Sequence, residues 1–553
     1  MVCSVGRMKR DIDTLASRQH DVLVIGGGIH GAAILREAAL IGLSAALVEQ
    51  HDFASSTSSN SLKIIHGGLR YLQQADVPRL LESVRERRFF LSRAPHLVAP
   101  LPCIMPTRGL GLYSAPALGA AFLINDILSC NRNANVPPSR RIPPGRLVPK
   151  RRALEILPGI SSAGVTGGAI WHDALAYDTE RLVVGVVRSA TEASATACNY
   201  VKALRPLAKN GRITGIVARD MISCREFEIA ARLVINTAPI TLAGFLGSSP
   251  VRIAPPSCGW ALMMNLVLRR QVISGYAAGL YSRRGRLLFF VPWRNRTIVG
   301  TSCSWVEGNP EDVRVTDAAV DELLADVREA YPGADIARED IAMIHAGLVP
   351  ASKPRRPGAE PAVARHFRLL DHSRLDGIEG LISVIGVKLT TARNVAEHVM
   401  RLAAAKLGKT LPRLDSSSKA LPGGDTGDPE VFFAAAKTRM PPSMPAAAVE
   451  HLLRCYGTEW DSVIKTSDSD PSLLNPLSGQ SEIIGAQAIF AVREEMAMTL
   501  SDVVFRRTGL GTTGLDDRQA VTACAAAIGK ELKWSEERMR EEAARLSADP
   551  FNR

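Results

Sequence analysis

The stretch that most constrains the fold is DVLVIGGGIHG, residues 21–31. Its first five residues are almost all apolar, as is typical of a parallel strand buried on both faces. Gly26, Gly28 and Gly31 follow with the spacing G-x-G-x-x-G, and the helical stretch AAILREAALIG comes next. A strand, a glycine turn and a helix in this order predict the start of a βαβ nucleotide-binding unit.

Each residue type in this motif has a physical role in holding a dinucleotide. Gly26 permits the tight turn, Gly28 lets the backbone approach a pyrophosphate, and Gly31 lets helix and strand pack closely. The helix N-terminus offers amide donors and partial positive charge to the phosphates. Glu49 ends the next apolar run, SAALVE, where a carboxylate would accept ribose hydroxyls. The motif does not separate FAD from NAD, but its place near the start of a long chain favours a flavoprotein.

The whole chain sets wider limits on partners and location. With 553 residues it should divide into two or three domains. The net charge of +12 favours anionic partners. Nucleic acid is not expected, since no helix-turn-helix, zinc or RNA-binding signature is found. Nine cysteines without CxxC or metal spacing predict a reducing compartment and no metal site.

Three segments bear on membranes. The first twenty residues contain no apolar core, so no secretory signal is expected. The apolar run 109–124 is shorter than the ~20 residues that span a bilayer, and it is predicted to be buried in a mixed domain. Residues 132–152 hold seven Lys or Arg and no acid. That segment either docks on anionic lipid or forms a solvated basic loop, and both interpretations stay open.

A third feature is the polar stretch SSTSSNSLKIIHGGLRYL at residues 55–72. Together with the glycine motif before it, this stretch resembles the N-terminus of FAD-dependent glycerol-3-phosphate dehydrogenases. The resemblance continues in order through FFVPWRNRTIVGTS (289–302), LISVIGVKLTTARNVAEH (381–398), LPGG (421–424) and EEMAMTLSDVVFRRTGLG (494–511). It covers nearly the whole chain.

This resemblance implies an α/β fold with three parts. They are a glutathione-reductase-type, Rossmann-like FAD-binding domain, a mixed-sheet substrate domain and a C-terminal α-helical domain. The chain crosses between the first two more than once. We expect the FAD-binding domain at 19–100, 185–250 and 346–410, the substrate domain at 101–184 and 251–345, and the helical domain at 411–553. The apolar runs 230–238 and 380–386 independently read as further strands of the nucleotide domain.

The family reaction oxidises the secondary alcohol of sn-glycerol 3-phosphate to the ketone, with hydride passing to flavin N5. The resemblance implies three residues at the reacting centre. Arg70 matches a substrate arginine, Lys388 matches a lysine beside the flavin, and His66 is either a base or a residue that orients the flavin. Lys388 could neutralise the reduced ring or, with a lowered pKa, take the proton. A phosphorylated substrate needs such fixed cations.

The resemblance also implies the residues that line FAD. Lys63 is expected to contact an FAD phosphate, a backbone carbonyl or the substrate. The serine-rich loop would run along the pyrophosphate and ribityl chain, the two glycines after His66 would pass near the ring, and two threonines would meet its polar edge. These residues are Ser56, Thr57, Ser58, Ser61, Gly67, Gly68, Thr390 and Thr391.

Some substrate-gripping positions depart from the family pattern. Val349 stands where an arginine is usual, and Asn265 stands where a histidine is expected. The exact substrate is therefore open. The leading hypothesis is a dehydrogenase of glycerol 3-phosphate or a similar phosphorylated polyol that passes electrons to quinone. The alternatives are a soluble oxidase or dehydrogenase of another alcohol or amine that uses oxygen, and a flavin-binding scaffold without catalysis.

The expected location is the cytoplasm of a bacterium, either free or peripheral on the cytoplasmic face of the inner membrane. An anionic membrane surface is one expected partner, and a homodimer is left open. The sequence does not decide the electron acceptor or the pathway.

Overall fold

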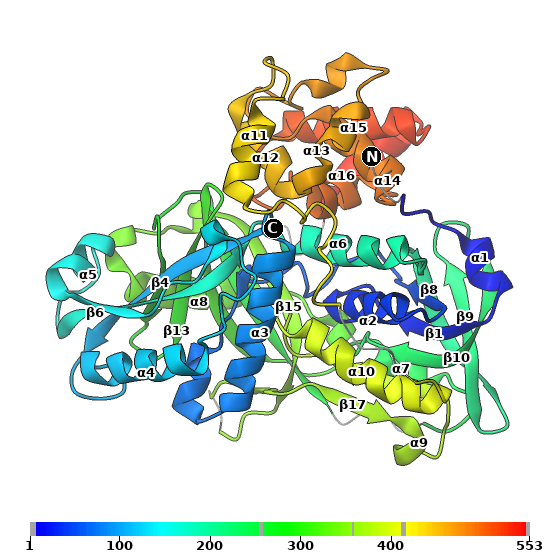
Figure 1. Ribbon diagram of the computed structural model, residues 1–553, viewed down its shortest axis with the longest axis horizontal. Helices are drawn as coiled ribbons and strands as arrows, with labels where there is room; N and C mark the ends of the chain where they lie inside the picture. Colours follow the sequence, from blue (N-terminus) through cyan, green and yellow to red (C-terminus); the bar gives the residue numbers. More distant parts are fainter. Residues whose placement is uncertain (1–6, 254–257, 357–358, 411–415, 549–553) are drawn as a thin grey trace.

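A computed structural model describes residues 7–253, 258–356, 359–410 and 416–548. Two sheets lie side by side, and a helical domain rises above them (Figure 1). This arrangement confirms the predicted fold class. The expected boundary at 410/411 falls at the edge of residues 411–415, which lie outside the described residues.

The nucleotide sheet has a parallel centre in the order β18, β10, β1, β2 and β7. β17 adds antiparallel to β18, and β8 and β9 pair antiparallel with the first half of β10. The strands are β1 (His20–Ile25), β2 (Ala45–Val48), β7 (Thr196–Cys198), β8 (Val201–Lys209), β9 (Arg212–Asp220), β10 (Glu226–Asn236), β17 (Arg368–Asp371) and β18 (Leu381–Ile385). The strands predicted within residues 21–25, 44–49, 230–238 and 380–386 are all present.

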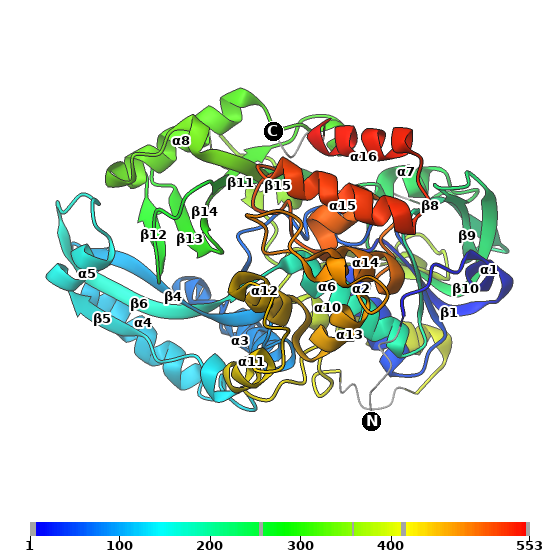
Figure 2. The same ribbon diagram turned by 90° about the horizontal axis from the view of Figure 1, so that it is seen from above.

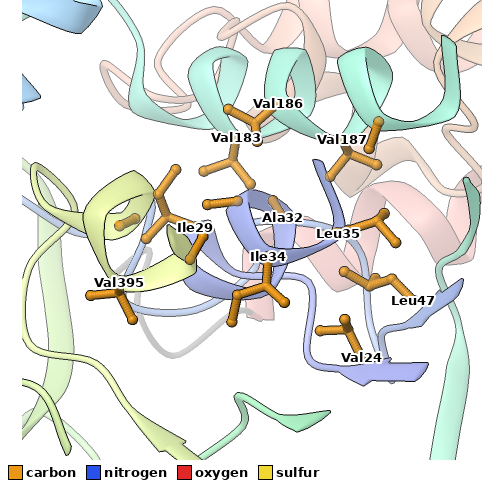
Figure 3. Packing of buried hydrophobic residues seen from close by; sticks show 14 of the residues in the cluster. Val24, Ile29, Ala32, Ile34, Leu35, Leu47, Val183, Val186, Val187 and Val395 are labelled. Carbon is orange, nitrogen blue, oxygen red and sulfur yellow. The ribbon is translucent and has the colours of Figure 1, made fainter. Parts of the chain in front are cut away.

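Helices pack on one face of this parallel centre because their apolar side chains meet those of the strands. α2 (Ile29–Leu40) lies between α6 (Thr179–Glu192) and α10 (Ala392–Leu407). Figure 3 shows valines of α6 and α10 turned towards Ile29, Ala32 and Leu35 of α2. A second core, with α1 (Ile12–Ser17) and α7 (Leu242–Gly247), fills the space between the sheet and the β8–β9 hairpin. The glycine turn, which leads into α2, is thus held in place by a buried helix.

The substrate sheet runs in the order β16, β15, β11, β14, β13, β12, β4, β6 and β3, with β5 beside β6. Its strands are β3 (Ile64–Ile65), β4 (Val98–Arg108), β5 (Arg146–Pro149), β6 (Val165–Ala176), β11 (Gly259–Leu268), β12 (Ala277–Tyr281), β13 (Leu287–Trp293), β14 (Arg296–Trp305), β15 (Ile341–Ser352) and β16 (Ala362–Val363). The expected boundary at 345/346 cuts through β15, which pairs with β11. The substrate sheet therefore continues to Val363.

Helices around the substrate sheet include α3 (Val77–Arg93), α4 (Ala115–Leu128), α5 (Lys150–Ile156) and α8 (Asp317–Ala330), whereas the short α9 (His372–Leu375) lies beside β17 and β18 of the nucleotide sheet. A 3-10 helix, η1 (Leu69–Gln74), leads into α3. The C-terminal domain contains α11 (Pro429–Lys437), α12 (Ala446–Tyr456), α13 (Trp460–Lys465), α14 (Gly485–Glu494), α15 (Arg518–Glu531), α16 (Glu536–Ala548) and a π-helical turn at Asp502–Arg507.

Buried ion pairs fix the C-terminal domain to the nucleotide domain. Arg181 of α6 pairs with Glu495 at 2.6 Å, and Arg188 pairs with Glu459 at 2.7 Å. Such pairs are strongly destabilising when one partner is removed, because the other charge stays buried. The two domains are therefore expected to keep one relative position.

The prediction that residues 109–124 are buried is wrong. This run forms the loop before α4 and most of α4 itself, at the outer end of the substrate sheet (Figures 1 and 2). Leu110 is almost fully exposed, Leu112 is largely exposed, and Leu123 and Ile124 are also exposed. Only Phe122 of α4 is buried, because this side of the helix alone faces the sheet. Within the described residues, no helix is both long and apolar enough to cross a membrane.

Candidate active site

The glycine turn has the geometry that a pyrophosphate requires. Gly26 has a φ of 105°, a conformation that only glycine adopts readily. A Cβ on Gly31 would collide with the Gly26 carbonyl oxygen. Gly28 is the N-cap of α2 and has no side chain with which to cap its amides. Residues 26–31 therefore bring the backbone and the N-terminus of α2 close together without side chains in the way, which fits the phosphates of FAD.

Glu49 lies at the end of β2, directly beside this turn. Its Oε2 accepts a hydrogen bond from Gly27 N at 2.6 Å, and its Oε1 accepts one from His51 N at 2.9 Å. Burial raises the pKa of Glu49, and these two hydrogen bonds oppose the rise. The carboxylate is thus held at the position predicted for the ribose contact.

The serine-rich loop joins the glycine turn to the substrate sheet. Ser58 Oγ accepts a hydrogen bond from Ile29 N at 3.0 Å, and Thr57 Oγ1 donates to the Leu348 carbonyl at 3.1 Å. Ser61 Oγ accepts from Lys63 N, while Ser56 is exposed. The loop therefore passes between the start of α2 and β15, next to the position of Val349.

Lys63 has a different role from the cofactor contact that was one expectation. It is fully buried, and its Nζ lies 2.6 Å from Glu180, 3.0 Å from Thr179 Oγ1 and 2.8 Å from the Ser59 carbonyl. An ammonium group has three donors, and these partners use all of them. The expected contact with a backbone carbonyl is present, at Ser59. Lys63 is therefore not among the residues we propose to hold FAD.

The His66 loop is fastened to β6 of the substrate sheet. β3 pairs with β6, and Gly67 N donates to Asp173 Oδ1 at 2.6 Å. His66 Nδ1 lies 3.2 Å from Asp173 Oδ2, while the side chain of His66 remains 46% exposed. A Cβ on Gly67 would collide with the buried guanidinium of Arg87, so this loop requires glycine. Gly68 then turns the chain with a φ of 83° into η1.

Three further residues of the site come together after this turn. Lys388 follows β18, and its Nζ donates to Tyr71 Oη. The ammonium also lies 4.2 Å from the centre of the Tyr71 ring, and the guanidinium carbon of Arg79 lies 4.1 Å from the same centre. Burial, and then the charge of Arg79, lowers the pKa of Lys388 to about 8. The site thus holds a lysine that can change its charge at moderately alkaline pH.

The structure places the remaining predicted residues around this centre. Arg70 is exposed on η1, one residue before Tyr71. Thr390 and Thr391 are buried at the start of α10, close after Lys388. Asn265 is buried in β11, where its Oδ1 accepts a hydrogen bond from Thr301. That bond gives Asn265 a structural partner within the sheet.

Sequence reasoning missed several contacts. No motif in the sequence pointed to Arg79 and Arg87 of α3, yet both are buried. Asp173 was not identified, although an acid inside the apolar strand sequence AIWHDALA was the available signal. Tyr71 stood in the quoted motif but received no role.

Comparisons with known proteins agree with this geometry. Residues 21–401 match the family model of FAD dependent oxidoreductases, and residues 415–539 match the C-terminal domain of alpha-glycerophosphate oxidase. The chain is 30% identical over 543 residues to a glycerol-3-phosphate dehydrogenase of Synechocystis sp., which covers 96% of each protein. It is 27% identical over 588 residues to an alpha-glycerophosphate oxidase of Streptococcus pneumoniae, over 95% of this chain and 94% of the relative.

A solved structure has the same fold over the whole length. It is the glycerol-3-phosphate dehydrogenase of Bacillus halodurans complexed with FAD, with a TM-score of 0.77 and 24% identity over 98% of this chain and 96% of that one. The resemblance predicted from the motifs is confirmed. The chain belongs to the FAD-dependent oxidoreductase family and, within it, to the glycerol-3-phosphate dehydrogenases.

Proposed function

We propose that the protein oxidises sn-glycerol 3-phosphate, or a closely similar phosphorylated polyol, to the corresponding ketone with FAD. When bound, FAD would supply the acceptor for the two electrons. The observation that supports the proposal is that His66 and Arg70 lie on the segment from β3 to η1, and that Lys388 contacts Tyr71 of the same segment. The chain is also similar to a glycerol-3-phosphate dehydrogenase over 96% of its length.

The chain would hold FAD along the path from the glycine turn to α10. The residues proposed for it share a place on that path: Gly26, Gly28, Gly31, Glu49, Ser56, Thr57, Ser58, Ser61, Gly67, Gly68, Thr390 and Thr391. The donors of the first turn of α2 would face the phosphates, as helix N-termini commonly do.

The catalytic residues would bind the substrate phosphate, supply positive charge and take the hydroxyl proton. Arg70 is exposed and makes no hydrogen bond or salt bridge with any residue of the described chain, so its guanidinium is available to the substrate phosphate. Lys388 remains protonated near neutral pH, since its pKa is lowered only to about 8, and it would add positive charge beside the flavin ring. His66 would take the hydroxyl proton.

The substrate is tested by anaerobic titration of the purified holoenzyme. Glycerol 3-phosphate is expected to bleach the visible absorbance of the flavin, whereas glycerol, which lacks the phosphate, is expected to leave it unchanged at the same concentration. Glycine and proline serve as amine substrates. Bleaching by an amine, with none by glycerol 3-phosphate, would contradict the proposed substrate, and no bleaching by any of them would favour the scaffold alternative.

We further propose that the enzyme docks on an anionic membrane and passes electrons to quinone. The α4 surface consists of exposed apolar residues on α4, the loop before it and β5: Leu110, Leu112, Leu123, Ile124, Ile127 and Leu147. Exposed cations from the same part of the chain accompany it, namely Arg108, Arg146, Lys150, Arg151 and Arg152. Monomeric proteins rarely expose a contiguous apolar patch, and cations beside one favour anionic lipid.

The α4 surface also lies near the substrate end of the site. The rings of Tyr113, in the loop before α4, and Tyr281 of β12 are 5.2 Å apart. Burial and Tyr113 raise the pKa of Tyr281, and the charge of Arg70 opposes this rise, so Arg70 lies close to the tyrosine pair. A membrane at the α4 surface would therefore bring quinone near the catalytic residues.

Docking is tested by co-sedimentation with vesicles. The wild type should sediment with phosphatidylglycerol vesicles and not with phosphatidylcholine alone. Leu123→Ser combined with Ile127→Ser should abolish sedimentation, since each buried Leu or Ile contributes about 1.5–3 kcal/mol. The matched control replaces Leu375 and Val431, which are equally exposed but lie elsewhere, with serine. Unchanged sedimentation of the α4 variant would contradict the docking surface.

The electron acceptor needs a separate assay because one relative is named an oxidase. Turnover with a soluble quinone should exceed turnover with oxygen, and hydrogen peroxide should not accumulate. Stoichiometric hydrogen peroxide in air would instead support a soluble oxidase.

A further inference from the structure

The Asp173–His66 pair lies at the β6–β3 end of the substrate sheet, at the catalytic end of the site. Asp173 lies in β6 of the substrate sheet, and His66 lies in the loop that follows β3. Asp173 is buried, and its two oxygens have different partners. Oδ2 faces His66 Nδ1 at 3.2 Å, whereas Oδ1 accepts from Gly67 N at 2.6 Å and lies 3.4 Å from Arg87 Nη1.

The charge on Asp173 determines which imidazole nitrogen carries the proton. Burial opposes ionisation, but hydrogen bonds from His66 and Gly67 and the charge of Arg87 hold the pKa of Asp173 below its ordinary value. An ionised carboxylate can only accept hydrogen bonds. His66 Nδ1 must therefore be the donor, which leaves Nε2 of a neutral imidazole without its proton and able to accept one.

From these contacts we infer that Asp173 is a positioning residue, which holds His66 in the tautomer whose Nε2 accepts the hydroxyl proton of the substrate. The inference rests on the proposed function and deepens it. As the substrate carbon gives up its hydride to the cofactor, the O–H bond breaks and its proton goes to His66 Nε2, so that a ketone and an imidazolium form. Asp173 then stabilises the imidazolium.

The groups around the pair do not supply a competing charge. Arg87 of α3 is the cation, and its Nη1 also donates to the His172 carbonyl at 2.6 Å. Burial, followed by the charges of Arg146 and Arg87, lowers the pKa of His172 to about 4, so this imidazole is neutral. Burial raises the pKa of Cys103 and of Tyr71, which therefore also stay neutral. Asp126 of α4 lines the same cavity, but it pairs with Arg132 at 3.1 Å, so Asp173 is the carboxylate that contacts His66.

The geometry makes Asp173→Asn a sharp test. Gly67 N–H and Arg87 both donate to Oδ1, so the asparagine must place its oxygen there and its NH₂ towards His66. His66 Nδ1 then becomes an acceptor, and the imidazole proton moves to Nε2. A backbone contact and the side-chain volume are retained, while the tautomer is reversed.

The first measurement is independent of substrate. Holoenzyme labelled with ¹⁵N-histidine is compared by NMR with His66→Gln, whose missing signals identify His66. The wild type should carry its proton on Nδ1, and Asp173→Asn should carry it on Nε2. The same tautomer in both proteins would overturn the inference. The matched control, Asp326→Asn, removes another buried carboxylate of the substrate domain, which pairs with Arg286, and should leave the His66 signals unchanged.

The second measurement is the anaerobic rate of flavin reduction by glycerol 3-phosphate. Asp173→Asn should lower it by about 10²–10⁴-fold, as loss of an orienting carboxylate does elsewhere. In a His66→Gln background, Asp173→Asn should add less than about threefold, since the two residues act as a unit.

The outcomes separate this inference from the proposed function. Multiplicative effects of His66→Gln and Asp173→Asn would overturn the inference and indicate a purely structural carboxylate. A wild-type flavin that glycerol 3-phosphate does not reduce would contradict the proposed function instead, and the NMR result would still decide the role of Asp173.

Discussion

The nucleotide end and the substrate end of the site are built in opposite ways. At the nucleotide end, Asp52 follows Glu49 and is fully enclosed. It accepts hydrogen bonds from Asn199 at 2.9 Å, from Arg506 at 2.7 Å and from Arg507 at 2.7 Å and 2.9 Å. At the substrate end, His66 and Arg70 are exposed. The nucleotide end is thus an enclosed end, closed by buried ion pairs, and the substrate end is an open end with exposed polar side chains.

This difference shows what the C-terminal domain contributes to the site. Arg506 and Arg507 come from its π-helical turn, so this domain holds the loop that carries the predicted ribose contact. Burial disfavours the charge on Asp52, yet the two arginines lower its pKa. Cofactor binding and stability should therefore depend on the C-terminal domain, whereas turnover should depend on the open end.

The largest effect is expected from Arg507→Ala, which tests the enclosed end. Removal of one partner from a buried ion pair typically costs about 3–5 kcal/mol. We expect that loss in the free energy of unfolding, measured with urea, and a weaker retention of FAD during gel filtration. The matched control is Arg493→Ala, because Arg493 pairs with Glu531 on the surface of the same domain at 2.7 Å. An exposed pair contributes about 0–1 kcal/mol, so equal losses in the two variants would contradict the comparison.

Lys388→Met tests the open end. FAD should stay bound, while the rate constant of flavin reduction should fall by about 10²–10³-fold, the usual effect of removing one charge-stabilising donor. The melting temperature at neutral pH should rise, since the half-buried ammonium, whose lowered pKa reflects the unfavourable burial of charge, is gone. Undiminished reduction would remove Lys388 from the mechanism.

Arg70→Gln should have a smaller effect that appears mainly in KM. A hydrogen bond to a charged group contributes about 1.5–3 kcal/mol, which corresponds to a loss of roughly 10–100-fold in kcat/KM. The variant should bind FAD as tightly as the wild type, because the arginine is exposed on η1. A fall in FAD affinity with an unchanged KM would place Arg70 at the cofactor instead.

The most gradual effect is a pH dependence due to Lys388. Its pKa of about 8 means that the ammonium is lost as pH rises through this value, so kcat/KM should fall by about tenfold per pH unit above 8. Lys388→Arg should keep its charge and remove this limb. Because the folded pKa lies below the ordinary value of 10.5, the stability cost of the charged form applies below pH 8 and disappears as pH rises towards 10.5. A flat profile between pH 7 and 10 in the wild type would contradict this role.

Local patterns in the sequence predicted the enclosed end well. The turn from Gly26 to Gly31 and the acid at Glu49 lie within one βαβ unit, so their spacing alone sets their geometry. The central strands could be predicted for a similar reason, since runs that are buried on both faces are recognisable from their composition.

Contacts between distant segments could not be predicted in this way. Lys63 pairs with Glu180, Asp173 with His66, and Asp52 with Arg507, across more than a hundred residues in each case. The prediction that residues 109–124 are buried was wrong for a different reason. The composition of this run resembles a core segment, and only the position of α4 at the outer edge of the sheet shows that it is exposed.

The most direct test of the account is the stoichiometry of one anaerobic turnover. Holoenzyme mixed with excess glycerol 3-phosphate, without an electron acceptor, should form one dihydroxyacetone phosphate for each FAD reduced. Lys388→Met with a full complement of FAD should form the same product at a far lower rate. An oxidised flavin and no ketone in the wild type, at any substrate concentration, would contradict the claim that the open end oxidises this alcohol.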